Sequence, residues 1–216
     1  MAEEALRALA QAGATIVDPA DIPTEDELDA DGSEFQVMLH EFHAGLDAYL
    51  AGRTGLPVRC LADVIAFNIA NASAELPHFG QEILEMALST GPLTGPVYLA
   101  ALERSRTLAG PRGIDAVMER HALDALVAPT GAPAAVIEGS GGSSSAAARA
   151  GYPLISVPAG FVGDLAVSVT FIGRAYSEEA GGVPRPETGP QPARPAVFGL
   201  DTWTMEVSTG APGSPA

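Results

Sequence analysis

The sequence predicts a mixed α/β fold, with helices in the first half of the chain and strands entering late. Two periodicities indicate this. Apolar residues recur at helical spacing over residues 34–50, and apolar and polar residues alternate over residues 165–171. The 216 residues are 47% apolar and 18% charged, a globular composition in a chain long enough for a core. We therefore expect a mixed β-sheet flanked by helices.

The N-terminal region contains two short elements before the first strong signal. Residues 3–12 are predicted to be helical, with Gly13 at the stop. Residues 14–17 indicate a short buried strand that Asp18-Pro19 ends. A polar, acidic loop is expected from there to Gly32.

The helix predicted over residues 34–50 has the clearest pattern in the chain. Ser33 and Gln36 have the spacing of a capping box, a pair of side chains that bonds the free N–H groups of a first helical turn. Seven apolar residues recur on one side of this helix and form a stripe: Phe35, Met38, Leu39, Phe42, Leu46, Tyr49 and Leu50.

The middle of the chain is predicted to be a series of helices. They are expected over residues 61–74 and 80–88, and again from residue 94, where Pro96 suits a first turn. Pro111 interrupts this last helix because it lacks a backbone N–H, and residues 113–121 resume it.

Strands enter in the last third. We predict strands over residues 125–128, 154–157 and 165–171, a flexible Gly/Ser loop over 139–145 and a short helix over 146–150. Gly163-Asp164 precedes the last strand and indicates a hairpin, with Val167, Val169 and Phe171 on one face. Pro and Gly become frequent after Glu179, so residues 179–216 are expected to be a disordered tail.

Charge and composition exclude several classes of function. The net charge is −16, which disfavours binding to nucleic acid or to an anionic membrane surface. All 11 basic residues are arginines, so no chemistry that needs a lysine amine is available. The single cysteine, Cys60, makes no internal disulfide, and the first residues lack the pattern of a secretory signal. We expect a cytoplasmic protein.

Six blocks of the sequence resemble the C-terminal half of the amidase-signature enzymes, in the order in which that family carries them. Within this family, the sequence resembles the peptide amidases and their bacterial relatives most. We accordingly assign residues 1–178 to a partial domain of the amidase-signature fold. The blocks are residues 35–51, 61–68, 75–82, 123–130, 151–161 and 171–178.

The resemblance implies a reaction and also places its residues elsewhere. Amidase-signature enzymes hydrolyse carboxamide C–N bonds with a Ser–cis-Ser–Lys triad, whose lysine and Gly/Ser signature lie N-terminal to the blocks found here. No residue of this chain matches the triad, so no catalytic residue is assigned. The expectation is a fragment of an amidase that is inactive alone, acts on a small amide only within the complete enzyme, and needs no cofactor.

Other interpretations of the chain remain open. It is alternatively a non-catalytic pocket or interaction module, or one half of a split enzyme that requires a separately encoded N-terminal partner. A third reading is a decayed gene without function. Residues after Glu179 depart from the helix that usually follows in the family, which suggests the hypothesis of a shifted reading frame.

Two segments supply candidate pocket residues. The run from Gly139 to Ser145 imitates a nucleophile signature, but its neighbours match a C-terminal family block whose Gly/Ser loop helps to line or support the pocket. Ser143 and Ser144 are therefore candidate pocket residues and not a triad. His78 and Phe79 lie in a segment that resembles a substrate-facing loop of the family, and they are the second pair of candidates.

The pair His40 and His43 hints at a zinc-binding helix. The metalloprotease pattern places its histidines four residues apart, whereas these are three apart, and no third ligand is nearby in the sequence. Both are expected at the border of the apolar stripe as solvated or edge residues. No metal site is therefore assigned.

Overall fold

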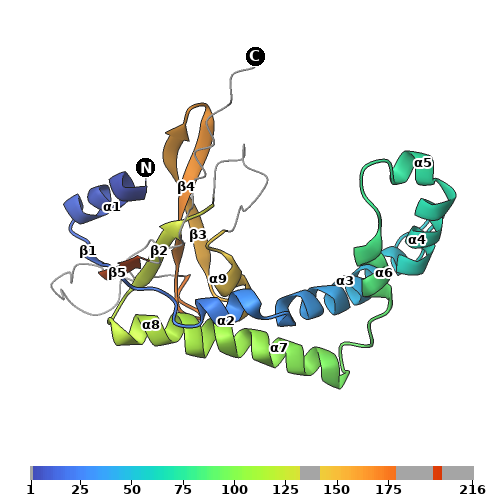
Figure 1. Ribbon diagram of the computed structural model, residues 1–216, viewed down its shortest axis with the longest axis horizontal. Coiled ribbons are helices and arrows are strands. Elements are labelled where there is room, and N and C mark those ends of the chain that lie inside the picture. The colour runs from blue at the N-terminus through green and yellow to red at the C-terminus, as the bar shows by residue number, and fades with distance from the viewer. Residues whose placement is uncertain (1, 132–141, 179–196, 201–216) are drawn as a thin grey trace, which may run out of the picture. The chain divides into compact units, whose positions relative to one another are not determined.

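The computed structural model describes residues 2–131, 142–178 and 197–200, and Figure 1 shows their helices and strands. The chain divides into two compact units. Unit 1 comprises Met1–Leu28 and Leu108–Ala216, and unit 2 comprises Asp29–Thr107. The described residues include no helix with the length and hydropathy of a membrane span.

A five-stranded mixed sheet organises unit 1, with the strand order β1-β5-β2-β4-β3. Strand β5 pairs in parallel with both β1 and β2. Strand β4 pairs antiparallel with both β2 and β3. The α/β prediction is thereby confirmed. The strands are β1 (Thr15–Val17), β2 (Ala125–Pro129), β3 (Leu154–Val162), β4 (Leu165–Ile172) and β5 (Val197–Leu200).

Strand β5 corrects the expectation of a disordered tail over residues 179–216 at one place. Residues 197–200 include Val, Phe and Leu, and pairing with two parallel neighbours satisfies their backbone groups on both sides. The residues around this short run are rich in Pro and Gly, so the sequence did not indicate a strand there. The expected Gly/Ser loop over residues 139–145 lies partly outside the described residues.

The predicted hairpin is present as β3 and β4. Val162 pairs with Leu165, so the turn consists of Gly163 and Asp164, and Gly163 has a φ of 60° that suits glycine. The strand β3 extends five residues beyond the predicted end at Val157, with a register shift between Pro158 and Gly160. It is an edge strand, and apolar side chains along it are exposed.

Helices supply most of the core of unit 1. The predicted interruption at Pro111 is a π-helical turn, η1 (Gly110–Ile114), between α7 (Pro96–Ala109) and α8 (Asp115–Arg120). The predicted first and late helices are α1 (Ala2–Gln11) and α9 (Ser145–Ala150). The strand β1 is half-buried at most, not buried as predicted. The largest buried residues of the core are Leu108, Ile114, Val117, Met118, Leu126 and Ile172.

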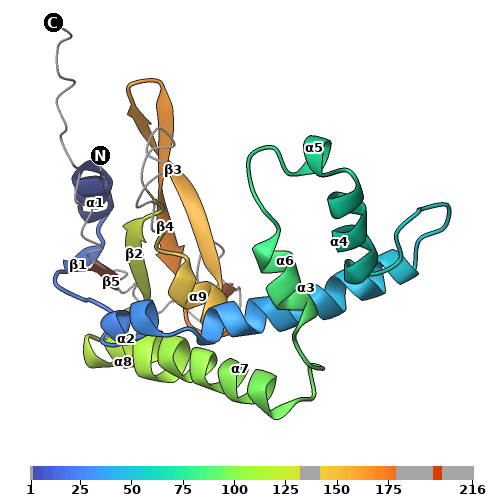
Figure 2. The ribbon, with the colours of Figure 1, turned by 45° about the vertical axis from the view of Figure 1, so that its right-hand side comes forward.

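Unit 2 is helical and has a small core. Figure 2 shows α4 and α6 beside the long helix α3, in agreement with their contacts. Four buried residues, Leu39, Leu61, Ile65 and Ala87, form the core. The helices are α3 (Ser33–Ala51), α4 (Leu61–Ala70), α5 (Ala72–Glu75), α6 (Glu82–Leu88) and the part of α7 up to Thr107.

Four of the seven residues of the apolar stripe predicted on α3 do not contribute to this core. Leu39 and Leu50 are buried, whereas Phe35, Met38, Phe42 and Tyr49 are exposed. The prediction of the helix is confirmed, but not that of a uniformly packed face. Few helices in unit 2 contact α3, so one side of the stripe has too few neighbours to cover it.

The start of α3 corrects the predicted capping box. No side chain at the N-cap bonds the first turn; instead Asp31 Oδ2 accepts the Ser33 N–H at 3.1 Å and also bonds the Ser33 hydroxyl. Arg104 pairs with the other carboxylate oxygen. Burial alone would raise the pKa of Asp31, but the hydrogen bonds from Ser33 and Arg104 outweigh it and lower that pKa.

The expected acidic loop before Gly32 also contains a helix, α2 (Glu25–Ala30). Three acidic residues occupy its first turn, where their negative charges interact favourably with the positive end of the helix dipole. Leu28 is the buried residue of this helix and belongs to the core of unit 1. The acidic composition of this segment suggested a loop, whereas the burial of Leu28 and the acidic first turn stabilise a helix.

Candidate functional site

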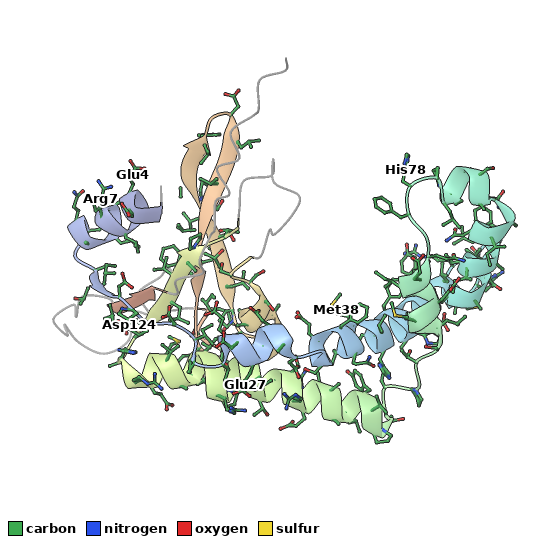
Figure 3. All side chains as sticks on the ribbon, viewed as in Figure 1. Glu4, Arg7, Glu27, Met38, His78 and Asp124 are labelled. Atoms are coloured by element: carbon green, nitrogen blue, oxygen red, sulfur yellow. The ribbon has the colours of Figure 1, made fainter. Side chains whose placement is uncertain are left out.

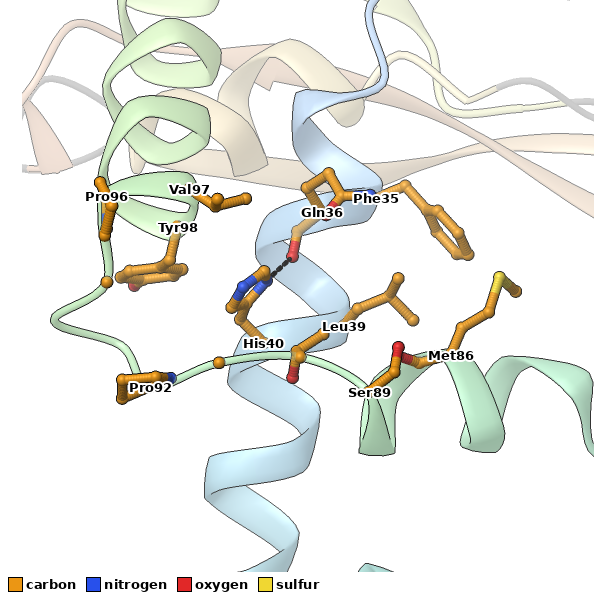
Figure 4. Close-up of a pocket in the computed structure, with 13 residues that line it drawn as sticks. Phe35, Gln36, Leu39, His40, Met86, Ser89, Pro92, Pro96, Val97 and Tyr98 are labelled. Atoms are coloured by element: carbon orange, nitrogen blue, oxygen red, sulfur yellow. Dashed lines mark hydrogen bonds between the residues drawn. The ribbon is translucent and has the colours of Figure 1, made fainter.

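Unit 2 contains a pocket of about 430 Å³, which residues of α3, the end of α6 and the start of α7 line (Figure 4). This volume lies within the range of roughly 300–1,000 Å³ that is typical of small-molecule sites. The lining residues include no Asp, Glu, Lys or Arg. Its apolar walls come from Phe35, Leu39, Met86, Pro92, Pro96 and Val97.

Two buried aromatic side chains with polar atoms line this pocket, Tyr98 and His40, and His40 is only 4% exposed. Its Nδ1 lies 2.7 Å from the carbonyl oxygen of Gln36, one helical turn earlier on α3. The ring centroid is 5.7 Å from that of Tyr98, which α7 contributes. The sequence predicted an edge position for His40, which is wrong because α7 covers it.

Tyr98 turns its hydroxyl away from His40 toward an acid. The hydroxyl donates to Glu41 Oε1 at 2.7 Å, and this hydrogen bond together with burial raises the pKa of Tyr98. Its ring therefore stays neutral at physiological pH and contributes an apolar surface. Sequence reasoning missed Tyr98, since nothing in a helical pattern tells which tyrosine will reach a distant helix.

The hydroxyl side chains of the pocket are already bonded to nearby backbone. Ser89 Oγ donates to the Met86 carbonyl at 2.6 Å, and Thr90 Oγ1 donates to the Ala87 carbonyl at 2.7 Å. Thr90 also lies 3.2 Å from His43 Nδ1. These bonds close the end of α6 and use the hydroxyl hydrogens, so neither hydroxyl has a hydrogen left to donate to a ligand.

His43 is separate from the His40 ring in its contacts. Its Nε2 lies 3.5 Å from Asp47 Oδ2, one turn later on α3, and its side chain is partly exposed, as predicted for an edge residue. Across the described ranges, no group of three or more His, Cys, Asp or Glu side chains is arranged to hold a metal ion.

The candidate residues His78 and Phe79 lie in the loop between α5 and α6, where Figure 3 labels His78. Both are exposed, Phe79 to 85%, and neither lines the pocket of unit 2. Among the described residues, no hydrogen bond or ion pair involves the side chain of His78. Their pocket role stays a prediction.

The candidate residues Ser143 and Ser144 belong to unit 1, at the start of α9. Ser143 is buried, and its Oγ has no hydrogen-bond partner among the described residues, whereas Ser144 is exposed. The preceding residue, Gly142, forms an isolated bridge with Gly131 just after β2. A buried hydroxyl without a partner is unusual in a folded protein.

A row of hydroxyls crosses the antiparallel part of the sheet in unit 1. Thr170 on β4 is fully buried, and its Oγ1 lies 2.8 Å from Thr130 Oγ1 and 3.0 Å from Ser156 Oγ. The alternation predicted over residues 165–171 places Thr170 on the face opposite Val169, but it did not predict that Thr170 itself is buried. The alternation of Ser168 and Thr170 with apolar residues shows in the sequence that they share a face. It does not show which residues of the neighbouring strands lie opposite them.

Comparison with known proteins finds amidases that are similar to most of this chain. No family model matches. A probable amidase of Arabidopsis thaliana is 34% identical over 179 residues, which cover 80% of this chain and 32% of that protein. Its alignment thus takes in both units.

Solved structures of amidases are similar in fold as well. The native peptide amidase of Stenotrophomonas maltophilia is 43% identical, with a TM-score of 0.66, over 74% of this chain and 32% of that one. A peptide amidase in complex with the competitive inhibitor chymostatin is 43% identical, with a TM-score of 0.74, over 82% and 37% of the two chains. The chain spans about a third of the length of these relatives.

Proposed function

From the premise that this chain is related to the amidase-signature family, we propose that it forms the C-terminal part of the scaffold and pocket wall of a carboxamide hydrolase. The observation that carries the proposal is the 43% identity and TM-score of 0.74 to a peptide amidase over 82% of the chain. Similarity of this degree in both sequence and fold extends beyond a shared architecture.

The composition of the chain supports a catalytic centre that other polypeptide supplies. The family triad requires a lysine amine that exchanges a proton with serine, and the 216 residues contain 11 arginines and no lysine. Arginine does not replace lysine in this role, because its guanidinium stays protonated in proteins. The base of the reaction is therefore assigned to residues outside this sequence.

The exposed apolar surface favours contact with further polypeptide. On the edge strand β3, Ile155, Phe161 and Val162 are exposed, and the backbone of an edge strand retains free hydrogen-bonding groups. In unit 2, Ile69 and Ile83 are exposed as well. Such surface suits a longer or separately encoded N-terminal part, which is also the alternative of a split enzyme.

The test uses ammonia release from a C-terminally amidated dipeptide. We expect the purified 216-residue chain to release no ammonia above buffer. Mixed or fused with the N-terminal part of the peptide amidase of Stenotrophomonas maltophilia, it is expected to gain activity. The same N-terminal part with its catalytic lysine replaced by alanine serves as the control and should stay inactive. Turnover by the chain alone would overturn the assignment.

A further inference from the structure

We infer that the pocket of unit 2 is a binding site for a neutral, largely apolar ring compound with one hydrogen-bond donor, which donates to Nε2 of His40. This inference stands on unit 2 alone and does not depend on the proposed hydrolysis. It assigns a ligand class to the cavity and a specific role to one imidazole nitrogen.

The tautomer of His40 follows from its partner. A backbone carbonyl has no proton, so the 2.7 Å contact with the Gln36 oxygen requires that Nδ1 carries the hydrogen. In the neutral imidazole Nε2 is then an acceptor. This is the reverse of a histidine that donates toward its ligand, and it selects donors over acceptors.

Nε2 of His40 is not fully buried. Among the described residues, the one fully buried side-chain nitrogen or oxygen without a hydrogen-bond partner is Ser143 Oγ. No hydrogen bond within the described structure reaches Nε2 of His40, so this atom is not sealed in the interior. Because His40 lines the pocket, the pocket is where Nε2 is open.

The other buried polar groups of the pocket are committed elsewhere. Tyr98 donates to Glu41, and Ser89 and Thr90 donate to backbone carbonyls of α6. Gln36 also lines the pocket, but its side chain is exposed and keeps its hydration, and the donating hydroxyls keep acceptor lone pairs. Nε2 of His40 is the buried ring nitrogen that can accept among these groups. A ligand that is apolar apart from one donor fits it, since any further buried polar group would lose its hydration without replacement. A charged ligand is disfavoured for the same reason, because no ionised carboxylate, guanidinium or ammonium lines the cavity.

The first experiment separates the acceptor from the cavity. Equilibrium dialysis at pH 7.5 measures binding of 2-naphthol and of 2-methylnaphthalene, which has the same shape without the donor, to the full 216-residue chain. In His40→Phe, which keeps a ring at this position, the affinity for 2-naphthol should fall about tenfold while that for 2-methylnaphthalene does not fall. Equal loss for both probes, or no binding of 2-naphthol to the unmodified chain, would refute the inference.

A second pair of variants tests the location without touching buried residues. Val97 is 63% exposed and lines the pocket, whereas Met38 is 57% exposed and does not. Val97→Trp should weaken both probes by obstructing the pocket, and Met38→Trp should weaken neither. Circular dichroism melts verify that each variant is folded. If His40→Phe is unfolded, this pair decides, and equal effects of the two tryptophans would count against the site.

Discussion

The hydroxyl of Tyr152 donates a hydrogen bond of 2.6 Å to Asp115 Oδ2, which ties the segment before β3 to the first turn of α8. Arg174 lies on the other side of the same carboxylate, 4.0 Å from Oδ1. The ring of Tyr152 packs against Gly110, where an added Cβ would meet the hydroxyl oxygen at 3.1 Å. One tyrosine thus contacts the π-helical turn and the helix that follows it.

This hydrogen bond predicts how stability depends on pH in the alkaline range. Burial and the hydrogen bond to Asp115 raise the pKa of Tyr152 to about 12, from 10.0. Below pH 10 the stabilising contribution of this hydrogen bond is fully present, because the Tyr152 phenol is neutral in both the folded and the unfolded state. Between pH 10 and 12 only the unfolded state ionises, so the folded state loses roughly 1–2 kcal/mol, allowing for solvent screening.

Urea titrations from pH 8 to 12 check this expectation against Tyr152→Phe. At pH 8 the variant should be less stable by about 1 kcal/mol, the usual net value of a lost hydrogen bond. This difference should shrink as the pH rises toward 12. A difference that stays constant over the whole range would exclude Tyr152 as the source.

Two glycines are predicted to respond oppositely to alanine. At Gly113 a Cβ would lie 2.6 Å from the Leu108 carbonyl oxygen and 3.0 Å from Thr24 Oγ1, so Gly113→Ala should destabilise unit 1 by about 1–3 kcal/mol. At Gly45, inside α3, nothing lies within 4 Å, and Gly45→Ala should stabilise by about 0.5–1 kcal/mol. Thermal melts of both variants measure the two signs, and the same sign for both would contradict this packing.

Asp47 is expected to stabilise the start of α4 from outside that helix. Its Oδ1 accepts the Leu61 N–H at 2.7 Å, while the N-cap residue, Cys60, makes no side-chain bond there. Asp47→Ala should therefore cost about 1 kcal/mol, as the loss of a capping acceptor does. Asp47→Asn retains a side-chain oxygen and should recover most of the stability in urea titrations. An asparagine variant as unstable as the alanine variant would point to charge instead.

A buried and an exposed arginine should differ in what they contribute. Arg149 is buried, and its Nη1 donates to the Leu28 carbonyl at 3.0 Å, so Arg149→Met should cost about 1–3 kcal/mol. Arg112 pairs with Glu27, and both side chains are about half exposed. Arg112→Met should cost less than about 1 kcal/mol and depend on salt. Denaturation at low and high salt compares the two variants, and equal costs would argue against burial as the cause.

Much of the secondary structure was predictable because its causes are local. Gly13 and Pro96 mark helix ends by their own backbone preferences, and Gly163-Asp164 marks the hairpin turn. Pro111 predicted an interruption, although the result is a π-helical turn that lets the helix resume. The short strand β5 was not predictable, since its pairing partners are far away in the sequence.

The pocket was less predictable than the fold. The family resemblance pointed to His78, Phe79, Ser143 and Ser144, and none of these four residues is among those that line the cavity of unit 2. His40 was visible only as part of a weak zinc pattern. Its burial depends on Tyr98, and a helical periodicity indicates which side of a helix is apolar, not which neighbour covers it.

The sequence by itself determined the amidase relationship and the absence of a lysine, because residue order and composition need no coordinates. It also determined most helices and the hairpin, since caps, turns and periodicity act over a few residues. Tertiary structure decided which residues of the α3 stripe are buried, where β5 pairs, and which nitrogen of His40 can accept. These depend on contacts between distant segments, whose free energies no local pattern encodes.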